Sequence, residues 1–194
     1  MNEPKRWNAN DPIGQARFTT GLEVASMISG GFNAWALNLL DYYAPPGSDC
    51  LLVGENPNVI PILQPLFPNL NFFAPYGYSG NLGKDFEQDF NILFTPSRTY
   101  DIVLCNYCLE HVCRPSIFLE NMNNLCKVGG YSITLTNGPK CPLHGIPIDC
   151  LRFLRDFFID ICKYIPMELV TYFSDCHANP WEGLYCGAVY QRLK

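Results

Sequence analysis

The stretch that begins at Tyr100 constrains the fold more than any other, because strand-like and helix-like patterns alternate along it. Residues 100–105 form a short apolar run, and residues 131–136 are rich in β-forming side chains. Pro115 stands between them, where a helix would begin. Apolar residues follow it at helical spacing: Phe118, Leu119, Met122, Leu125 and Cys126. The order strand, helix, strand predicts a parallel sheet with a right-handed crossover, whose functional loops leave the carboxyl ends of the strands.

The same pattern continues past the second strand. Gly129-Gly130 is predicted to stop the first helix. Asp149 is predicted to cap a further helix, in which Leu154, Phe157, Phe158 and Ile161 form one apolar stripe. The full prediction for this stretch is therefore strand, loop, helix, turn, strand, loop, helix.

The flanking regions extend this alternation. A loose leader is expected over residues 1–13, and the N-terminal helices are expected to pack on the sheet rather than to act as a lid. Such amphipathic helices are core elements far more often than gates. The predicted elements are a helical region from Gln15 to Tyr43 broken at Gly30-Gly31, strands at 49–54 and 71–74, a helix starting near Pro57, and final strands at 167–173 and 184–191.

Two motif groups in this stretch resemble the class I S-adenosylmethionine (SAM) dependent methyltransferases, especially the large group that acts on small molecules. That group carries patterns like F-D-x-V, L-E-H-V, D-P and L-K-P-G-G, and then H-x-x-P-x-D-x-x-R-F. The matching residues are Tyr100–Val103, Leu109–Val112, Arg114-Pro115 and Leu125–Gly130, followed by His144, Pro147, Asp149, Arg152 and Phe153. The matched core covers about a quarter of the chain and is more specific for the fold than for the reaction.

The resemblance implies an α/β fold: a Rossmann-like, mostly parallel seven-stranded sheet with helices on both faces and a reversed last strand. It also implies one domain over residues 1–194, with a leader and helices at 1–43 and the Rossmann-like core at 49–194. The implied function is methyl transfer from SAM to a small-molecule acceptor.

The family's cofactor positions map onto five residues of this chain. Gly54 and Glu55 occupy the place of the glycine-rich loop, and Asn106 reaches the loop over the cleft. Asp89, followed by Phe90, stands where the family holds the adenine.

The chain departs from the family's cofactor pattern at two places. Glu55, Asn56 and Pro57 replace the other loop glycines, and no carboxylate ends the second strand, where the family binds the ribose. These departures support an alternative function, a catalytically inactive methyltransferase-fold protein that serves as a binding or regulatory subunit.

His144 is the candidate catalytic residue. The resemblance places it on the loop after a central strand, over the acceptor pocket. A histidine there can act as the general base that takes the acceptor's proton. The alternative role is to brace this proline-rich loop, and both roles stay open. For Asp149 and Arg152 a structural pairing is preferred.

Two residue sets have metal-like spacing, but no metal site is predicted from either. Some family members bind a divalent ion through E-x-x-E-H, and Glu110 and His111 match its end while Tyr107 replaces the first glutamate. One carboxylate with one or two imidazoles underfills a site for a hard cation, so a structural role is preferred. Cys105-x-x-Cys108 and Cys141-x-x-His144 have the spacing of zinc ligands. Cys105 is more simply interpreted as an inward residue of its strand.

Composition argues against several other classes of protein. With a net charge of −5 and no basic block, the chain lacks the phosphate-neutralising surface of a non-specific nucleic-acid binder. No apolar run is long enough to cross a bilayer, and the N-terminus lacks the apolar core of a signal peptide. A cytoplasmic protein is therefore expected, with its ten cysteines mostly buried as thiols. The expected partner is a small-molecule acceptor, or another protein if the chain is inactive.

Overall fold

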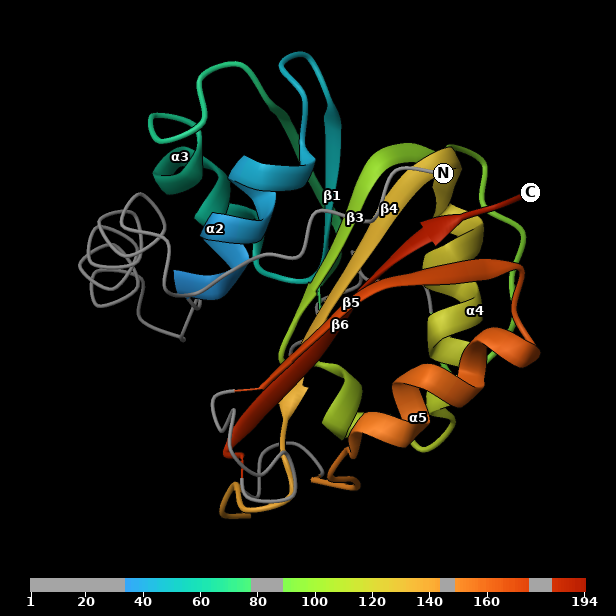
Figure 1. The fold of residues 1–194 in the computed structure, drawn as a ribbon. Helices are drawn as coiled ribbons and strands as arrows, with labels where there is room; N and C mark the ends of the chain where they lie inside the picture. Colours follow the sequence, from blue (N-terminus) through green and yellow to red (C-terminus); the bar gives the residue numbers. More distant parts are fainter. Residues whose placement is uncertain (1–33, 78–88, 144–148, 175–182) are drawn as a thin grey trace.

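Strands and helices alternate along the chain in the computed structural model, which describes residues 34–77, 89–143, 149–174 and 183–194 (Figure 1). The first half contains α2 (Ala34–Tyr43), β1 (Asp49–Gly54), η1 (Pro57–Val59), α3 (Ile60–Leu63), β2 (Asn71–Gly77) and β3 (Tyr100–Asn106). The second half contains η2 (Leu109–His111), α4 (Pro115–Leu125), β4 (Cys126–Asn137), α5 (Arg155–Asp160), η3 (Ile161–Lys163), β5 (Met167–Ser174) and β6 (Tyr185–Arg192). His144 and residues 1–33 lie outside the described part.

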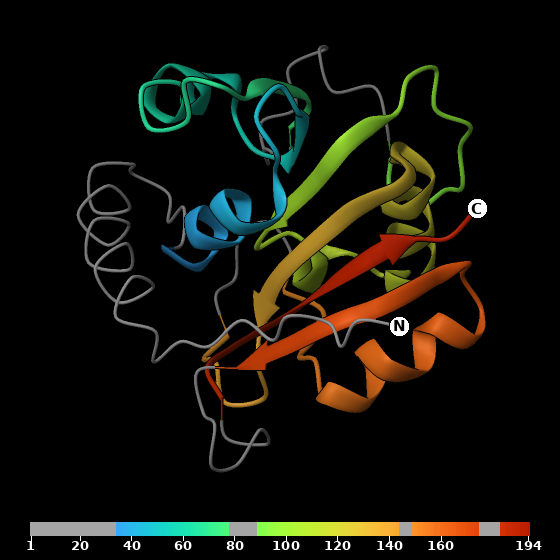
Figure 2. The ribbon, with the colours of Figure 1, turned by 45° about the horizontal axis from the view of Figure 1, so that its top comes forward.

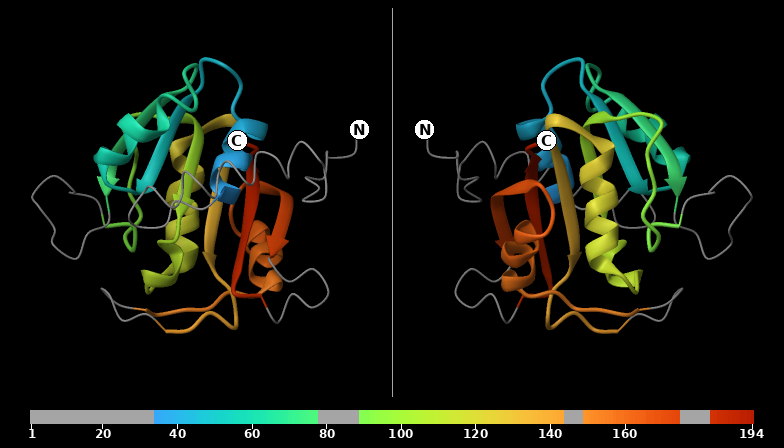
Figure 3. Two further views of the ribbon diagram at one scale, coloured as in Figure 1. Left: turned by 90° about the vertical axis from the view of Figure 1, so that its left-hand side faces the viewer. Right: turned by 90° about the vertical axis from the view of Figure 1, so that its right-hand side faces the viewer.

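The described strands form one six-stranded sheet in the order β2-β1-β3-β4-β6-β5. β1 pairs in parallel with β2 and β3, and β3 pairs in parallel with β4. β6 runs antiparallel to both β4 and β5. Figure 3 shows β1 and β2 at one end of this row and β5 and β6 at the other. The predicted parallel core and the reversed last strand are confirmed, and a seventh strand is not among the described residues.

Neighbouring residues of the central strands point to opposite faces of the sheet, and each face has its own apolar cluster. Cys50 and Leu52 of β1 join the cluster that contains α2 and α3. Leu51 and Val53 join the cluster that contains α4 and α5. The two helix pairs lie on opposite sides of the strands in Figures 1 and 2. A continuous apolar run such as the one in β1 therefore marks a strand buried on both faces.

α2 is a packing element of the sheet. Four of its apolar side chains are buried against β3 and β4: Ala36, Leu37, Leu39 and Leu40. The edge of the Trp35 ring also meets Phe173 of β5, with 5.4 Å between ring centroids. The prediction that this helix packs on the sheet is confirmed for residues 34–43. Within the described ranges, no helix is long and apolar enough to cross a bilayer.

The prediction that Gly129-Gly130 stops a helix is wrong. α4 ends at Leu125, and β4 begins at the next residue. The pairing of β3 with β4 shifts in register between Tyr100 and Ile102, and Gly129 has a φ of +81° beside this irregularity. Glycine adopts that conformation without the steric cost of a Cβ atom, so Gly129-Gly130 accommodates a bulge inside β4.

The prediction that Asp149 caps the next helix is also wrong. α5 begins at Arg155, and its N-cap position is held by Leu154, which makes no side-chain capping hydrogen bond. Asp149 does form the predicted ion pair with Arg152. Residues 149–154 therefore form an irregular segment before the helix, whose shape depends on that ion pair.

Candidate functional site

The carboxyl ends of β1, β3 and β4 lie side by side along one edge of the sheet. Val53 pairs with Cys105, and Asn106 pairs with Leu135, so the three parallel strands end close to the same level. This edge is the lower one in Figure 1, where η2 and the loop after β4 are also found. Polar side chains that follow the strand ends therefore converge here, as they do in other open α/β sheets.

Gly54, Glu55 and Asn106 all lie at this edge, and their role toward the cofactor stays a prediction. Gly54 ends β1 with a φ of +82°, which favours glycine over any residue with a Cβ atom. The side-chain amide of Asn106 donates a hydrogen bond to Glu55 Oε1 at 3.0 Å. Asn106 is buried and Glu55 is half-buried. Burial raises the pKa of the Glu55 carboxyl above its usual value, and the hydrogen bond from Asn106 opposes that rise.

Glu55 should make the free energy of unfolding fall as the pH rises from acid. Because its pKa is raised in the folded state, its contribution to stability is complete below the usual value of 4.5 and is lost as the pH rises through the raised value. The neutral amide of Glu55→Gln lacks that loss. Urea denaturation at several points between about pH 4 and about pH 7 should show the wild type losing stability relative to the variant. Parallel pH profiles would contradict this assignment.

An aromatic pair borders the same edge. Tyr107 follows β3 with a φ of +56°, a conformation that is rare for residues other than glycine and is often found at functional sites. Its backbone N–H donates to the carbonyl of Leu135 at 3.0 Å. Its ring meets the ring of Tyr185 edge-on, with 5.6 Å between centroids. Tyr185 begins β6, so this contact depends on the reversed strand and has no local sequence signal.

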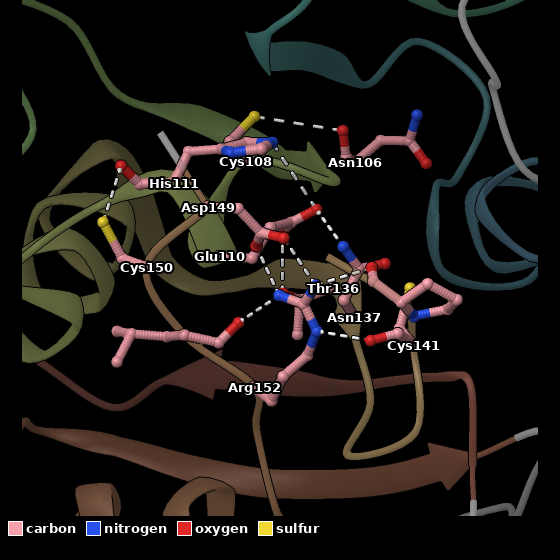
Figure 4. Close-up of polar contacts among 12 residues, drawn as sticks. Asn106, Cys108, Glu110, His111, Thr136, Asn137, Cys141, Asp149, Cys150 and Arg152 are labelled. Carbon is pink, nitrogen blue, oxygen red and sulfur yellow. Dashed lines mark hydrogen bonds and ion pairs between the residues drawn. The ribbon is translucent and has the colours of Figure 1, made fainter. Parts of the chain in front are cut away.

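Glu110 is fully buried below the edge and links η2 to the end of β4. Its carboxylate accepts hydrogen bonds from Thr136 Oγ1 at 2.7 Å and from Asn137 Nδ2 at 3.0 Å (Figure 4). His111 Nε2 lies 3.8 Å from the same carboxylate. Within the described residues, no group of three or more histidine, cysteine or acidic side chains could hold a metal ion. These contacts agree with the structural role preferred for Glu110.

Arg152 fixes the loop between β4 and α5, as Figure 4 shows. Its guanidinium makes a two-pronged ion pair with Asp149, and this pairing raises the pKa of Arg152. It also donates to the backbone carbonyls of Cys141 at 2.9 Å and Pro142 at 2.8 Å. The side chains of Arg152 and Asp149 are both largely buried. Arg152 thus holds the residues on both sides of 144–148, although the sequence suggested only its pairing with Asp149.

Asp89 and Phe90 occupy a different setting from Glu55 and Asn106. Asp89 is exposed, and its carboxylate accepts hydrogen bonds from the backbone and side chain of Asn91 at 2.8 and 3.0 Å. The Phe90 ring is buried near Phe118, with 5.2 Å between centroids. Their role toward the adenine stays a prediction.

The cysteine set considered for zinc is used differently. Cys105 and Cys108 are both buried, and the Cys108 thiol lies 3.3 Å from the carbonyl oxygen of Val53. Cys141 is half-buried in the loop held by Arg152, and His144 lies outside the described residues. The interpretation of Cys105 as an inward strand residue is confirmed by its burial.

Comparison with known proteins gives a result for the fold alone. No family model matches the sequence, and no curated protein matches it either. Many solved structures do match, and the three described next are SAM-dependent or other methyltransferases. The chain has a methyltransferase-like fold.

Three of these structures show the extent of the likeness. The sugar N-methyltransferase KedS8 from Streptoalloteichus sp ATCC 53650 aligns with a TM-score of 0.58 and 14% identity, over 82% of this chain and 86% of that one. The 1,6-didemethyltoxoflavin-N1-methyltransferase of Burkholderia thailandensis was solved with 1,6-didemethyltoxoflavin and S-adenosylhomocysteine bound. It aligns with a TM-score of 0.53 and 15% identity, over 98% of this chain and 94% of that one. A TehB-like SAM-dependent methyltransferase from Corynebacterium glutamicum ATCC 13032 Kitasato aligns with a TM-score of 0.53 and 11% identity, over 94% of this chain and 100% of that one. These three alignments thus cover between 82% and 98% of this chain.

Proposed function

We propose that this protein is a SAM-dependent methyltransferase that acts on a small-molecule acceptor. The observation that carries the proposal is the meeting of Gly54, Glu55 and Asn106 at the carboxyl edge of a methyltransferase-like sheet. Ligands of open α/β sheets bind at this edge. The Burkholderia neighbour, which holds S-adenosylhomocysteine and its small acceptor, supports both parts of the proposal.

The charge state of Glu55 tests whether the chain fits the cofactor. A half-buried carboxyl whose pKa is raised by burial is one that a nearby cation would stabilise in its charged form. SAM carries two cationic groups, an ammonium and a sulfonium. Gly54 adds a backbone without a Cβ atom at the same place. Pro57 offers no N–H, and β2 brings no carboxylate to its end within Asn71–Gly77, so Glu55 takes on more of the binding than in the family pattern.

Each residue then has a definite task. SAM, when bound, supplies an electrophilic methyl group. Glu55 and Asn106 would hold its amino-acid end, and Asp89 with Phe90 would hold the adenosine end. His144 accepts the proton from the nucleophilic atom of the acceptor. Methyl transfer needs little more than alignment and exclusion of water. The buried Glu110 and the ion pair of Arg152 with Asp149 would support the loops that serve this purpose.

Titration calorimetry with SAM and S-adenosylhomocysteine tests the proposal. We expect micromolar binding to the wild type and about 10- to 100-fold weaker binding to Asp89→Ala, the loss typical of a hydrogen bond to a charged group. His144→Ala should keep the wild-type affinity but form less S-adenosylhomocysteine with a panel of hydroxyl and amine acceptors. Asp156→Ala serves as the matched control, because Asp156 is an exposed aspartate on α5.

The second candidate is an inactive methyltransferase-fold protein that binds another molecule. The departures from the family's cofactor pattern favour it, because Pro57 offers no N–H and no carboxylate ends β2 within Asn71–Gly77. If millimolar SAM did not raise the Tm of the protein, the methyltransferase proposal would be overturned and this candidate supported. Unchanged affinity in Asp89→Ala would instead show that the adenine position is assigned wrongly.

A further inference from the structure

Two cysteines from separate segments bring their sulfur atoms together beside the candidate site. Cys113 lies between η2 and α4, and Cys150 lies in the loop between β4 and α5. Their Sγ atoms are 3.8 Å apart, although the residues are 37 positions apart in the sequence. Neither belongs to the metal-like spacings of the sequence, and the proposed function uses neither.

The backbone holds both residues in this arrangement. The Cys113 N–H donates to Asn91 Oδ1 at 2.9 Å. The Cys150 N–H donates to the carbonyl of Glu110 at 2.8 Å. Cys150 Sγ also lies 3.9 Å from the carbonyl oxygen of His111, a contact drawn in Figure 4. The two main chains are therefore anchored with the sulfur atoms 3.8 Å apart, against about 2.05 Å in a disulfide bond.

The two thiols differ in access, which sets the order of their chemistry. Of the nine cysteines in the described residues, Cys113 is the exposed one, and Cys150 is half-buried. Burial, together with the neighbouring Cys113 thiol, raises the pKa of Cys150. An oxidant in solution therefore meets Cys113 first, and Cys150 stands ready as the resolving thiol.

We propose that Cys113 and Cys150 are a modification site that forms a reversible disulfide by exchange with a small-molecule disulfide. The Cys113 thiolate attacks one sulfur of the small disulfide, which gives a mixed disulfide and releases one small thiol. The Cys150 thiolate then attacks Cys113 Sγ, and the second small thiol leaves. The two cysteines lose two electrons and two protons, and the small disulfide is reduced to two thiols.

The bond would fasten the start of α4 to the loop that Arg152 clamps. That loop already donates two backbone hydrogen bonds to the Glu110 carbonyl, from Cys150 and from Leu151. A covalent link would keep it in this place even when those bonds open. The proposal concerns the thiols and the stability of the chain, so it does not depend on SAM binding.

Oxidised glutathione is the probe, and the full chain is incubated with it before free thiols are alkylated. Peptide mass spectrometry of the wild type should show the Cys113 and Cys150 peptides joined, lighter by two hydrogen atoms than the separate thiols. In Cys150→Ser, glutathione should stay on Cys113. The bond closes a loop of nearly forty residues, so the Tm of the oxidised wild type should rise by about 8 °C, and dithiothreitol should reverse the rise. Cys162→Ser, a half-buried cysteine outside this pair, should behave as the wild type.

Two results would overturn the proposal. One is glutathione that stays on Cys113 of the wild type as fully as in Cys150→Ser, because the resolving step would then be absent. The other is a joined peptide that involves a different cysteine partner. A wild-type Tm that rises no more than that of oxidised Cys150→Ser would count against the loop restraint in the same way.

Discussion

Gly187→Ala is expected to lower the free energy of unfolding by about 4 kcal/mol, a large part of the roughly 5–15 kcal/mol by which folded domains are stable. Gly187 lies in β6 between β4 and β5. A Cβ atom there would lie 2.2 Å from the backbone oxygen of Thr134 and 2.5 Å from Cζ of Phe173. The first of these atoms belongs to the sheet backbone and cannot move aside without breaking the ladder. Urea denaturation followed by circular dichroism measures the loss.

Gly129→Ala is the matched control for that variant. Gly129 has a φ of +81°, but an added Cβ atom would meet nothing within 4 Å. Its cost should therefore be about 1 kcal/mol, from backbone conformation alone. If the two variants lost equal stability, the close contact of β6 with β4 would not be the cause.

Glu110→Ala is expected to cost about 3–4 kcal/mol, although the residue lies at the edge where the cofactor is proposed to bind. The carboxylate is fully buried and is the acceptor for the Thr136 hydroxyl and the Asn137 amide. Alanine removes this acceptor from two buried donors and leaves a cavity, and each effect costs about 1–3 kcal/mol. The measurement is again the urea midpoint, with the slope checked for two-state behaviour.

Two companion variants separate the causes of that loss. Glu110→Gln keeps the volume and one acceptor oxygen, so about half of the stability should return. Glu168→Ala removes a glutamate from an exposed position of β5 and should change stability by less than about 0.5 kcal/mol. Were Glu110 instead a metal ligand, added zinc would stabilise the wild type and not Glu110→Ala. That result would overturn the structural role.

The central elements of the fold were predictable because their signals are local. The apolar run at 100–105 and the helical spacing after Pro115 reproduce β3 and α4 closely. The last two strands lie within about one residue of the predicted bounds, since buried strands carry dense β-forming side chains. The errors fell where one residue type serves two structures. Gly129 could end a helix or sit in a bulge, and Asp149 could cap a helix or pair with Arg152.

The candidate site was only partly predictable. Gly54, Glu55 and Asn106 were chosen because they match cofactor positions of the family, and the parallel sheet brings Glu55 and Asn106 together. The hydrogen bonds that Glu110 accepts from Thr136 and Asn137 depend on the order of the strands, which no short sequence pattern contains.

The sequence by itself determined the alternation of strands and helices and their approximate bounds, because hydrophobic periodicity acts over a few neighbouring positions. Only the tertiary structure decided which side chains meet: Glu55 with Asn106, Tyr107 with Tyr185, and Cys113 with Cys150. Each of these contacts joins segments far apart along the chain. They form because burial of apolar side chains fixes the order of the strands, and that order then sets which loops share an edge.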